Sequence, residues 1–334
     1  MTGAVLEILD PGVRTTVQDH PGRIGLQAKG IFPSGPVDHL AFRAANVLVG
    51  NAPGDAALEI PMGRFAARAH LRGRVAVCGA DGAEVTINGA PVPMWEAVDV
   101  RPGDVLAAGT LKGPGFRLYL AVSGGIDVPP VLGSRALHTG AGFGGLDGRA
   151  LVRGDAVPVG ACDVEGTPRL RLPQGLRPGY HRHWEIEVMR GPHAVPGYLT
   201  PSDWRDFVTS RWRVNLNSDR LYVRLNPHHF TWTRPDGGVA GAHPSNVLDG
   251  GYPVGGIIVN GDLPTILGPD GATSGGFTVI ATIVHAALWK VGQLCPGRDT
   301  VRFREVDLGQ AEALDRHAEF MLDPANLERV VSGG

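Results

Sequence analysis

The chain is poor in cysteine and in charge. Its three cysteines, Cys78, Cys162 and Cys295, lie far apart and form no CxxC pair. This spacing argues against a disulfide framework and against a thiolate metal site. Charged residues make up 19% of the 334 residues, the formal net charge is -2, and no basic block occurs. We therefore expect neither a nucleic acid nor an anionic membrane as partner.

Long hydrophobic runs are also missing. The first residues, MTGAVLEILDPG, have no charged start and no long apolar stretch, and no run of about 18 apolar residues occurs anywhere. We expect a soluble, cytoplasmic protein. The sequence also lacks a nucleophile elbow, a Walker loop and an HExxH motif, so it predicts no metal site and no familiar hydrolase chemistry.

Glycine and proline, in contrast, are abundant, with 49 and 27 residues, while the hydrophobic residues are 43% of the chain and come in short runs. This pattern favours many short strands joined by turns, and hence a mainly β fold of the barrel or sandwich type. In the first half the predicted strands are Val5–Leu9, Leu58–Ile60, Phe65–Ala67, Arg74–Cys78, Glu84–Ile87, Val105–Ala107 and Phe116–Leu120.

The clearest helix of the first half is predicted from Asp38 to Val49. Apolar residues recur there at steps of three and four, which gives one apolar face,. Asp38 is a good N-cap, and the preceding Ser34-Gly35 turn would aim the positive helix end at an anionic or carbonyl group. A simple capped core helix is the alternative.

The second half again predicts short strands, with helices that start near Thr200, at His285 and at Leu308. The motif G-x-G-x-x-G occurs at residues 140–145, but turn chemistry follows it and argues against a dinucleotide site,. We expect a lobe over residues 1–180, a second over 181–307, and a C-terminal helix and tail over 308–334. The second lobe's predicted strands are Trp184–Met189, Trp212–Val214, Leu221–Leu225, Phe230–Trp232, Gly256–Val259, Leu263–Leu267, Phe277–Val284 and Thr300–Arg304.

The segment Arg234–Phe277 is the richest in glycine, and polar residues stand at its turns. Glycine-rich backbone is typical of places where other groups approach the main chain more closely than a side chain would allow. Carboxylate, hydroxyl and amide groups of this kind can grip a planar amide, ureido or lactam group and stabilise oxyanion charge. A glycine-rich meander without a ligand is the alternative.

Three stretches together resemble one known family. They are Thr16–Asn51 (TVQDHPGRIGLQAKGIFPSGPVDHLAFRAANVLVGN), Leu120–Ser134 (LAVSGGIDVPPVLGS) and the glycine-rich segment. The family is that of the 5-oxoprolinase C subunit, also called KipA-like or allophanate hydrolase subunit 2. The same domain forms half of the carboxyltransferase unit of urea carboxylase.

The resemblance implies two tandem cyclophilin-like β-barrel lobes with a few short helices, in one component of a heteromeric enzyme. The first function that it implies is ATP-dependent opening of 5-oxoproline to glutamate, together with the B subunit, which is a KipI-like protein, and possibly the A subunit. The alternatives are a biotin-dependent carboxyltransferase component acting on urea or a related amide, and a KipA-like regulatory binding protein. ATP or carboxybiotin would then belong to the complex, and no cofactor is expected on this chain alone.

The sequence differs in some respects from both the 5-oxoprolinase and the urea carboxylase versions of this family. It shows no biotin carboxylase segment, no biotinyl-lysine motif and no fused B subunit, which favours a separate protein within a complex. The glycine-rich segment and ALWKVGQLCPG nevertheless look closer to the urea carboxylase version.

The resemblance also carries a set of site residues. We expect Asp270 as a hydrogen-bond acceptor and the Ser274-Gly275-Gly276 amides as carbonyl binders, while Arg43 and Asn46 match the family motif and are expected to support the helix. The predicted catalytic residues are Asp270, Ser274 and Asp38, and the predicted substrate-binding residues are Ser34, Gly35, Asn46, Asp236, His243, Asn246, Gly275 and Gly276.

Overall fold

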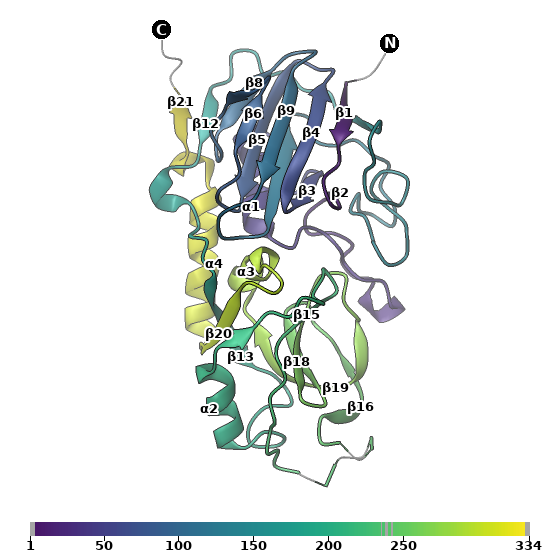
Figure 1. The fold of residues 1–334 in the computed structure, drawn as a ribbon, viewed down its shortest axis with the longest axis vertical. Helices are drawn as coiled ribbons and strands as arrows, with labels where there is room; N and C mark the ends of the chain where they lie inside the picture. The colour runs from purple at the N-terminus through teal and green to yellow at the C-terminus, as the bar shows by residue number, and fades with distance from the viewer. Residues whose placement is uncertain (1–3, 235, 238–239, 242, 331–334) are drawn as a thin grey trace. The chain divides into compact units, whose positions relative to one another are not determined.

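The computed structural model describes residues 4–234, 236–237, 240–241 and 243–330. The chain forms two compact units (Figure 1). The first comprises the described parts of Met1–Ile24, Ser34–Tyr180 and His317–Gly334, and the second those of Gly25–Pro33 and His181–Arg316. Among the helices of the described residues, none has the length and hydropathy of a membrane-spanning segment.

The first unit is built from two antiparallel sheets. Six strands follow the order β11-β1-β4-β9-β6-β7 and five follow β2-β3-β10-β5-β8. The first sheet contains β1 (Val5–Asp10), β4 (Gly63–Ala69), β6 (Val85–Ile87), β7 (Ala90–Pro91), β9 (Val105–Thr110) and β11 (Ala156–Pro158). The second contains β2 (Thr16–Gln18), β3 (Ala57–Pro61), β5 (Gly73–Gly79), β8 (Ala97–Val100) and β10 (Arg117–Val122).

One hydrophobic core lies between these sheets, with side chains such as Ile8, Phe65, Val77 and Leu120 from both of them. Strand β4 alternates buried and exposed residues, as expected for a sheet with one solvated face,. Strands β5 and β10 are buried along their whole length, because α1 (His39–Leu48) packs on their other face. The result is a β-sandwich with one helix against its second sheet.

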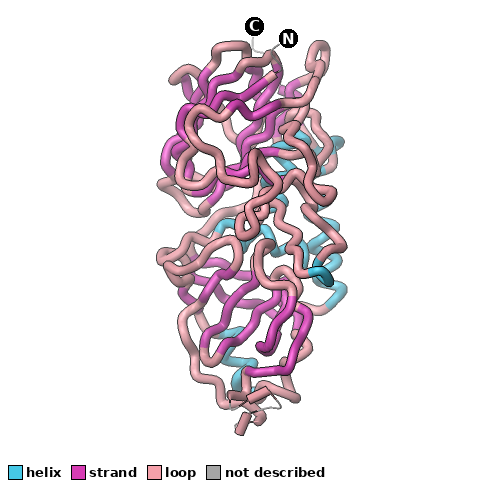
Figure 2. Tube along the Cα trace, turned by 90° about the vertical axis from the view of Figure 1, so that its right-hand side faces the viewer, coloured by secondary structure: helices cyan, strands magenta, loops and turns pink. Residues whose placement is uncertain are grey.

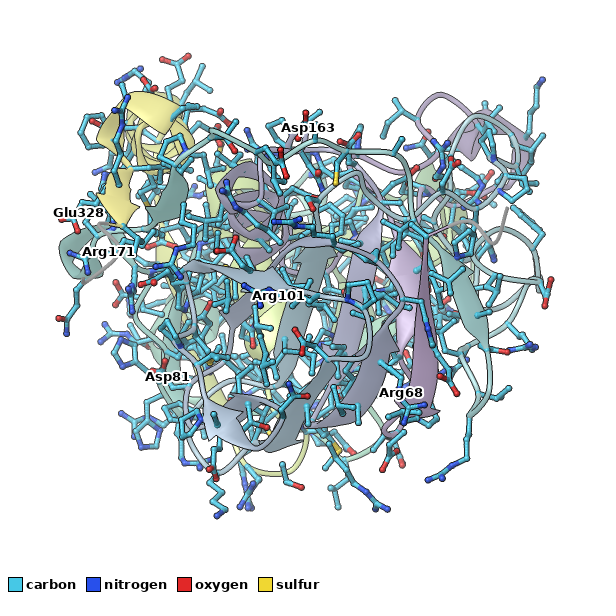
Figure 3. The ribbon with its side chains drawn as sticks, turned by 90° about the horizontal axis from the view of Figure 1, so that it is seen from above. Arg68, Asp81, Arg101, Asp163, Arg171 and Glu328 are labelled. Atoms are coloured by element: carbon cyan, nitrogen blue, oxygen red, sulfur yellow. The ribbon has the colours of Figure 1, made fainter. Side chains whose placement is uncertain are left out.

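The end of the chain returns to the first unit. Helix α4 (Leu308–Leu322) begins in the second unit and ends in the first. Strand β21 (Glu328–Val330) then pairs antiparallel with β12 (Arg169–Arg171). An ion pair of 2.6 Å joins Arg171 to Glu328, which lie together at one edge in Figure 3.

The second unit contains one mixed sheet with the order β14-β20-β13-β19-β17-β18-β15, and β16 also pairs with β19. Only β13 and β20 run parallel among its described strands. The strands are β13 (His183–Arg190), β14 (Trp212–Arg213), β15 (Tyr222–Arg224), β16 (Asn246–Gly251), β17 (Gly256–Asn260), β18 (Leu263–Leu267), β19 (Ser274–Ile283) and β20 (Thr300–Glu305).

Helices are few in this unit, as the tube in Figure 2 shows. Helix α2 (Pro201–Thr209) starts with a capping box in which Thr200 and Asp203 satisfy each other's backbone N–H groups,. Helix α3 (Leu288–Gln293) follows a short 3-10 turn, His285–Ala287. A single-turn 3-10 helix at Gln27–Lys29 also belongs to this unit, and two others, Gln174–Leu176 and Pro324–Asn326, belong to the first unit.

The mainly β prediction is confirmed, but closed barrels are not found. Each sheet of the described residues ends in edge strands. In the first unit the two sheets meet through side-chain packing and not through strand pairing, which makes a sandwich. The cyclophilin-like barrels implied by the resemblance are therefore corrected to open sheets.

The strand predicted at Phe230–Trp232 is also wrong. The N–H groups of Thr231 and Trp232 donate to the carboxylate of Asp203, at 2.8 and 3.1 Å. A side chain 28 and 29 residues earlier in the chain therefore takes the donors that a strand ladder would need,.

Candidate functional site

The start of α1 is a buried polar region. Asp38 is the N-cap, and its carboxylate accepts from Ala41 N at 2.9 Å. Its own N–H donates to the Tyr119 hydroxyl at 2.8 Å, and this hydroxyl donates to Glu59 at 2.8 Å. Burial, together with the charge of Glu59, raises the pKa of Tyr119 well above its usual value. Asp38 and Glu59 are both almost fully buried, so the predicted helix cap is confirmed as a fixed internal group.

The other predicted residues of the first unit surround this helix. Ser34 and Gly35 both have positive φ angles, 57° and 86°, and Gly35 N donates to Gln18 at 3.1 Å. Asn46 donates to Asp55 O at 2.8 Å and accepts from Asn51 at 2.9 Å. These contacts place Asn46 as a support of the helix end.

Asp270 is held by an internal ion pair. Its carboxylate accepts from Arg220 Nε at 2.9 Å, and the two side chains are 0% and 9% exposed. Because a buried charge without a counterion is costly, the pair fixes the segment after β18 against the start of β15. Arg220 was not predicted, since it lies 50 residues earlier in the sequence.

The glycines of this segment pack closely against other groups. A Cβ on Gly268 would lie 1.9 Å from Arg220 O, and one on Gly275 would lie 2.8 Å from the Tyr252 ring. Gly275 and Gly276 belong to β19, where Gly275 pairs with Gly250 of β16. Close packing inside the unit therefore explains why glycines, which have no side chain, occupy these positions. Ser274, at the start of β19, is exposed.

The remaining predicted residues lie before and at the start of β16. His243 Nδ1 lies 2.8 Å from the Ser245 hydroxyl, which accepts from Gly261 N at 3.0 Å. Asp236 is exposed and stands beside Pro235, which is outside the described residues. Asn246 is half-buried at the first position of β16.

A cavity of about 190 Å³ lies beside β16 in the second unit. Asn246 lines it, together with Asp249 from the same strand, His193 and Tyr198 from the loop after β13, and Arg234. The cavity thus combines a guanidinium, an imidazole, a phenol, an amide and a carboxylate. Among the described residues no group of three His, Cys, Asp or Glu side chains is placed to hold a metal ion.

The protonation of His193 is set by the backbone. Its Nδ1 accepts from Val279 N at 2.9 Å, so the proton of the neutral ring is assigned to Nε2. Partial burial lowers the pKa of His193. The ring is therefore neutral near pH 7 and presents one N–H donor.

Of these cavity residues, sequence reasoning identified Asn246 and missed His193, Tyr198, Arg234 and Asp249. His193 and Tyr198 sit in an ordinary Pro- and Gly-containing loop, so no local signal marks them. Arg234 and Asp249 stand inside the glycine-rich segment, where the polar residues at turns did give a signal.

The chain belongs to the carboxyltransferase domain family, subdomain A and B, which matches residues 29–305. This finding confirms the resemblance that the sequence motifs indicated.

Particular relatives include both kinds of enzyme. Urea amidolyase of Saccharomyces cerevisiae is 37% identical over 336 residues, which cover 98% of this chain and 18% of that protein. The 5-oxoprolinase C subunit of Escherichia coli is 33% identical over 315 residues, which cover 92% of this chain and 93% of that protein. The crystal structure of K. lactis urea amidolyase matches with a TM-score of 0.92 at 36% identity, over 100% of this chain and 20% of that one. The chain therefore corresponds to about a fifth of the urea amidolyases.

Proposed function

We propose that this chain is the carboxyltransferase component of an enzyme that moves a carboxyl group onto a urea-type nitrogen. The observation that carries the proposal is that the fold of this chain, over its full length, matches part of K. lactis urea amidolyase with a TM-score of 0.92. The 37% identity to the yeast urea amidolyase, against 33% to the 5-oxoprolinase protein of E. coli, supports the same choice. The proposal thus places the carboxyltransferase function first, whereas the sequence-based prediction placed the 5-oxoprolinase function first.

The donor substrate in this proposal is carboxylated biotin on a carrier protein. The substrate nitrogen forms a bond to the carboxyl carbon, the bond from that carbon to the donor nitrogen breaks, and the substrate proton passes to the donor nitrogen. The protein has to orient a planar amide, with donors for its C=O group and an acceptor for its N–H group.

We assign three roles to the predicted catalytic residues. Ser274 is the exposed one, and its hydroxyl donates to the substrate carbonyl. Asp38 and Asp270 are buried. Asp38 positions the backbone at the start of α1 by capping that helix, and Asp270 positions the segment after β18 through its ion pair with Arg220.

A second candidate is a 5-oxoprolinase C subunit, which would act with the A and B subunits and ATP. The observation in its favour is that the E. coli relative is matched over 93% of its own length. In either case the expected partner is a KipI-like protein, which corresponds to the B subunit.

Co-expression with such a partner tests the two candidates. The pair is assayed for carboxyl transfer from carboxybiotin to urea, and in parallel for ATP hydrolysis that depends on 5-oxoproline with the A subunit present. We expect urea-dependent transfer that avidin abolishes. Activity in the second assay alone would establish the second candidate, and a stable complex with a kinase without turnover would replace both with a regulatory role.

The role of Ser274 has its own variant. Ser274→Ala should lower kcat/KM for transfer by about 100-fold, the usual effect of losing one such donor. Ser202→Ala, on the exposed side of α2, is the matched control and should leave it unchanged. Equal rates for the two variants would remove Ser274 from the proposed site.

A further inference from the structure

The cavity beside β16 contains a cation that no described carboxylate neutralises. The Arg234 guanidinium lies 5.4 Å from the centre of the Tyr198 ring, and the described residues place no carboxylate at ion-pair distance from it. A stacked guanidinium is held in orientation while its N–H groups stay available. Such a group is well suited to bind a carboxylate in a bidentate manner.

A second donor stands on the same ring. The His193 imidazole meets Tyr198 edge-on, with ring centres 4.8 Å apart. Since Val279 N occupies Nδ1, the remaining nitrogen, Nε2, carries the proton of the neutral ring. Tyr198 is therefore in contact with both donors, and all three side chains line the cavity.

The cavity also contains an acceptor. One oxygen of Asp249 accepts the N–H of the next residue, Gly250, at 2.9 Å, and the described residues provide no cation for this carboxylate. The Asn246 amide stands three positions earlier on the same strand and adds one donor and one acceptor group. The lining thus has two opposite charges and neutral hydrogen-bonding groups.

We propose that this cavity binds a small carboxylate that also carries an amide or ureido N–H group. Arg234 and His193 donate to the carboxylate, and Asp249 accepts from the N–H group. The cavity volume of about 190 Å³ suits a compact molecule. The ligand class rests on the proposed function in one respect, because carboxylation of an amide nitrogen yields such a compound.

Binding of stable probes to the whole chain tests this site without turnover. Titration calorimetry compares 5-oxoproline with 2-pyrrolidone, which is the same ring without the carboxylate, and N-carbamoylglycine with urea. Each carboxylate should bind at least about tenfold more tightly than its neutral partner, as expected for charge-assisted hydrogen bonds.

Arg234→Met should reduce the affinity for each carboxylate about tenfold and leave the neutral probes unchanged. Arg224→Met is the matched control, because Arg224 also stacks at 5.4 Å on a tyrosine, Tyr222, in the same unit and does not line the cavity. It should bind all probes as the unchanged chain does. His193→Leu should weaken carboxylate binding, and His193→Gln, which keeps an N–H donor, should restore most of it.

Three results would overturn the proposal. They are absence of binding of every probe at millimolar concentration, equal affinity for charged and neutral probes, or loss of discrimination in Arg224→Met as well as Arg234→Met. Thermal unfolding of each variant shows that it is folded. Intact probe binding together with failed carboxyl transfer would refute the proposed function alone, and normal transfer without probe binding would refute this site alone.

Discussion

The pair of Asp270 and Arg220 shows how much depends on single residues in the glycine-rich segment. Both side chains are buried and joined at 2.9 Å. Close by, Gly268 approaches the backbone of Arg220 so tightly that no side chain fits. The same two segments are thus connected by a charge and by a close contact of main chains.

Asp270→Asn should lower the free energy of unfolding by about 3–5 kcal/mol, because it removes the carboxylate charge that faces the buried Arg220 guanidinium. Urea denaturation at pH 7 measures this change. The double variant Arg220→Met with Asp270→Leu removes both charges and should be less destabilised than either single change. A single variant within about 0.5 kcal/mol of the unchanged chain would show that the pair contributes little.

At the scale of elements, local signals predicted some parts and missed others. Helix α4 starts at Leu308 and strand β18 spans Leu263–Leu267, as the sequence predicted, because apolar periodicity and turn residues act within a few positions. The strand expected at Phe230–Trp232 failed because Asp203 takes its N–H groups. The cavity beside β16 was not predictable either, since the fold brings the loop of His193 to it from far along the chain.

Asp203 also makes the start of α2 sensitive to acid. Burial alone would raise the pKa of Asp203, but hydrogen bonds from Thr231, Thr200 and Trp232 outweigh burial and lower it. The unfolded chain therefore takes up this proton more readily than the folded one. The stability that the carboxylate contributes is present above the unfolded pKa of about 3.9 and is lost as the pH falls through the folded pKa.

Asp203→Asn should lower the free energy of unfolding by roughly 1.5–3 kcal/mol near pH 7. The difference from the unchanged chain should shrink below about pH 4, where Asp203 itself becomes protonated. Urea denaturation at a series of pH values between these limits measures both effects. A difference that stays constant over the series would mean that the charge of Asp203 is not what stabilises α2.

At the scale of the whole molecule, the first unit depends on both ends of the described chain. Strand β21 covers β12, and Glu319 of α4 binds Arg43 of α1 with two hydrogen bonds of 2.8 Å. Met321 and Leu322 are buried as well. The first unit therefore includes residues that come after the entire second unit.

A chain that ends after Arg316 should be less soluble and less stable. It leaves β12 without its partner strand β21, and unpaired edges promote association. Size-exclusion chromatography with light scattering should show oligomers or aggregates. The control, Glu319→Gln with Glu328→Gln, removes the two ion pairs and keeps the strand, so it should remain monodisperse to the same degree as the unchanged chain. Equal behaviour of the truncated chain would show that β21 is dispensable.

The return of the chain to the first unit has a consequence for synthesis on the ribosome. The second unit has all its residues once Arg316 has been added, whereas the first still waits for the segment after it. The first unit, whose synthesis begins first, therefore receives β21 only after the second unit has been made. During translation the β12 edge is open to chaperones and to neighbouring nascent chains until β21 emerges.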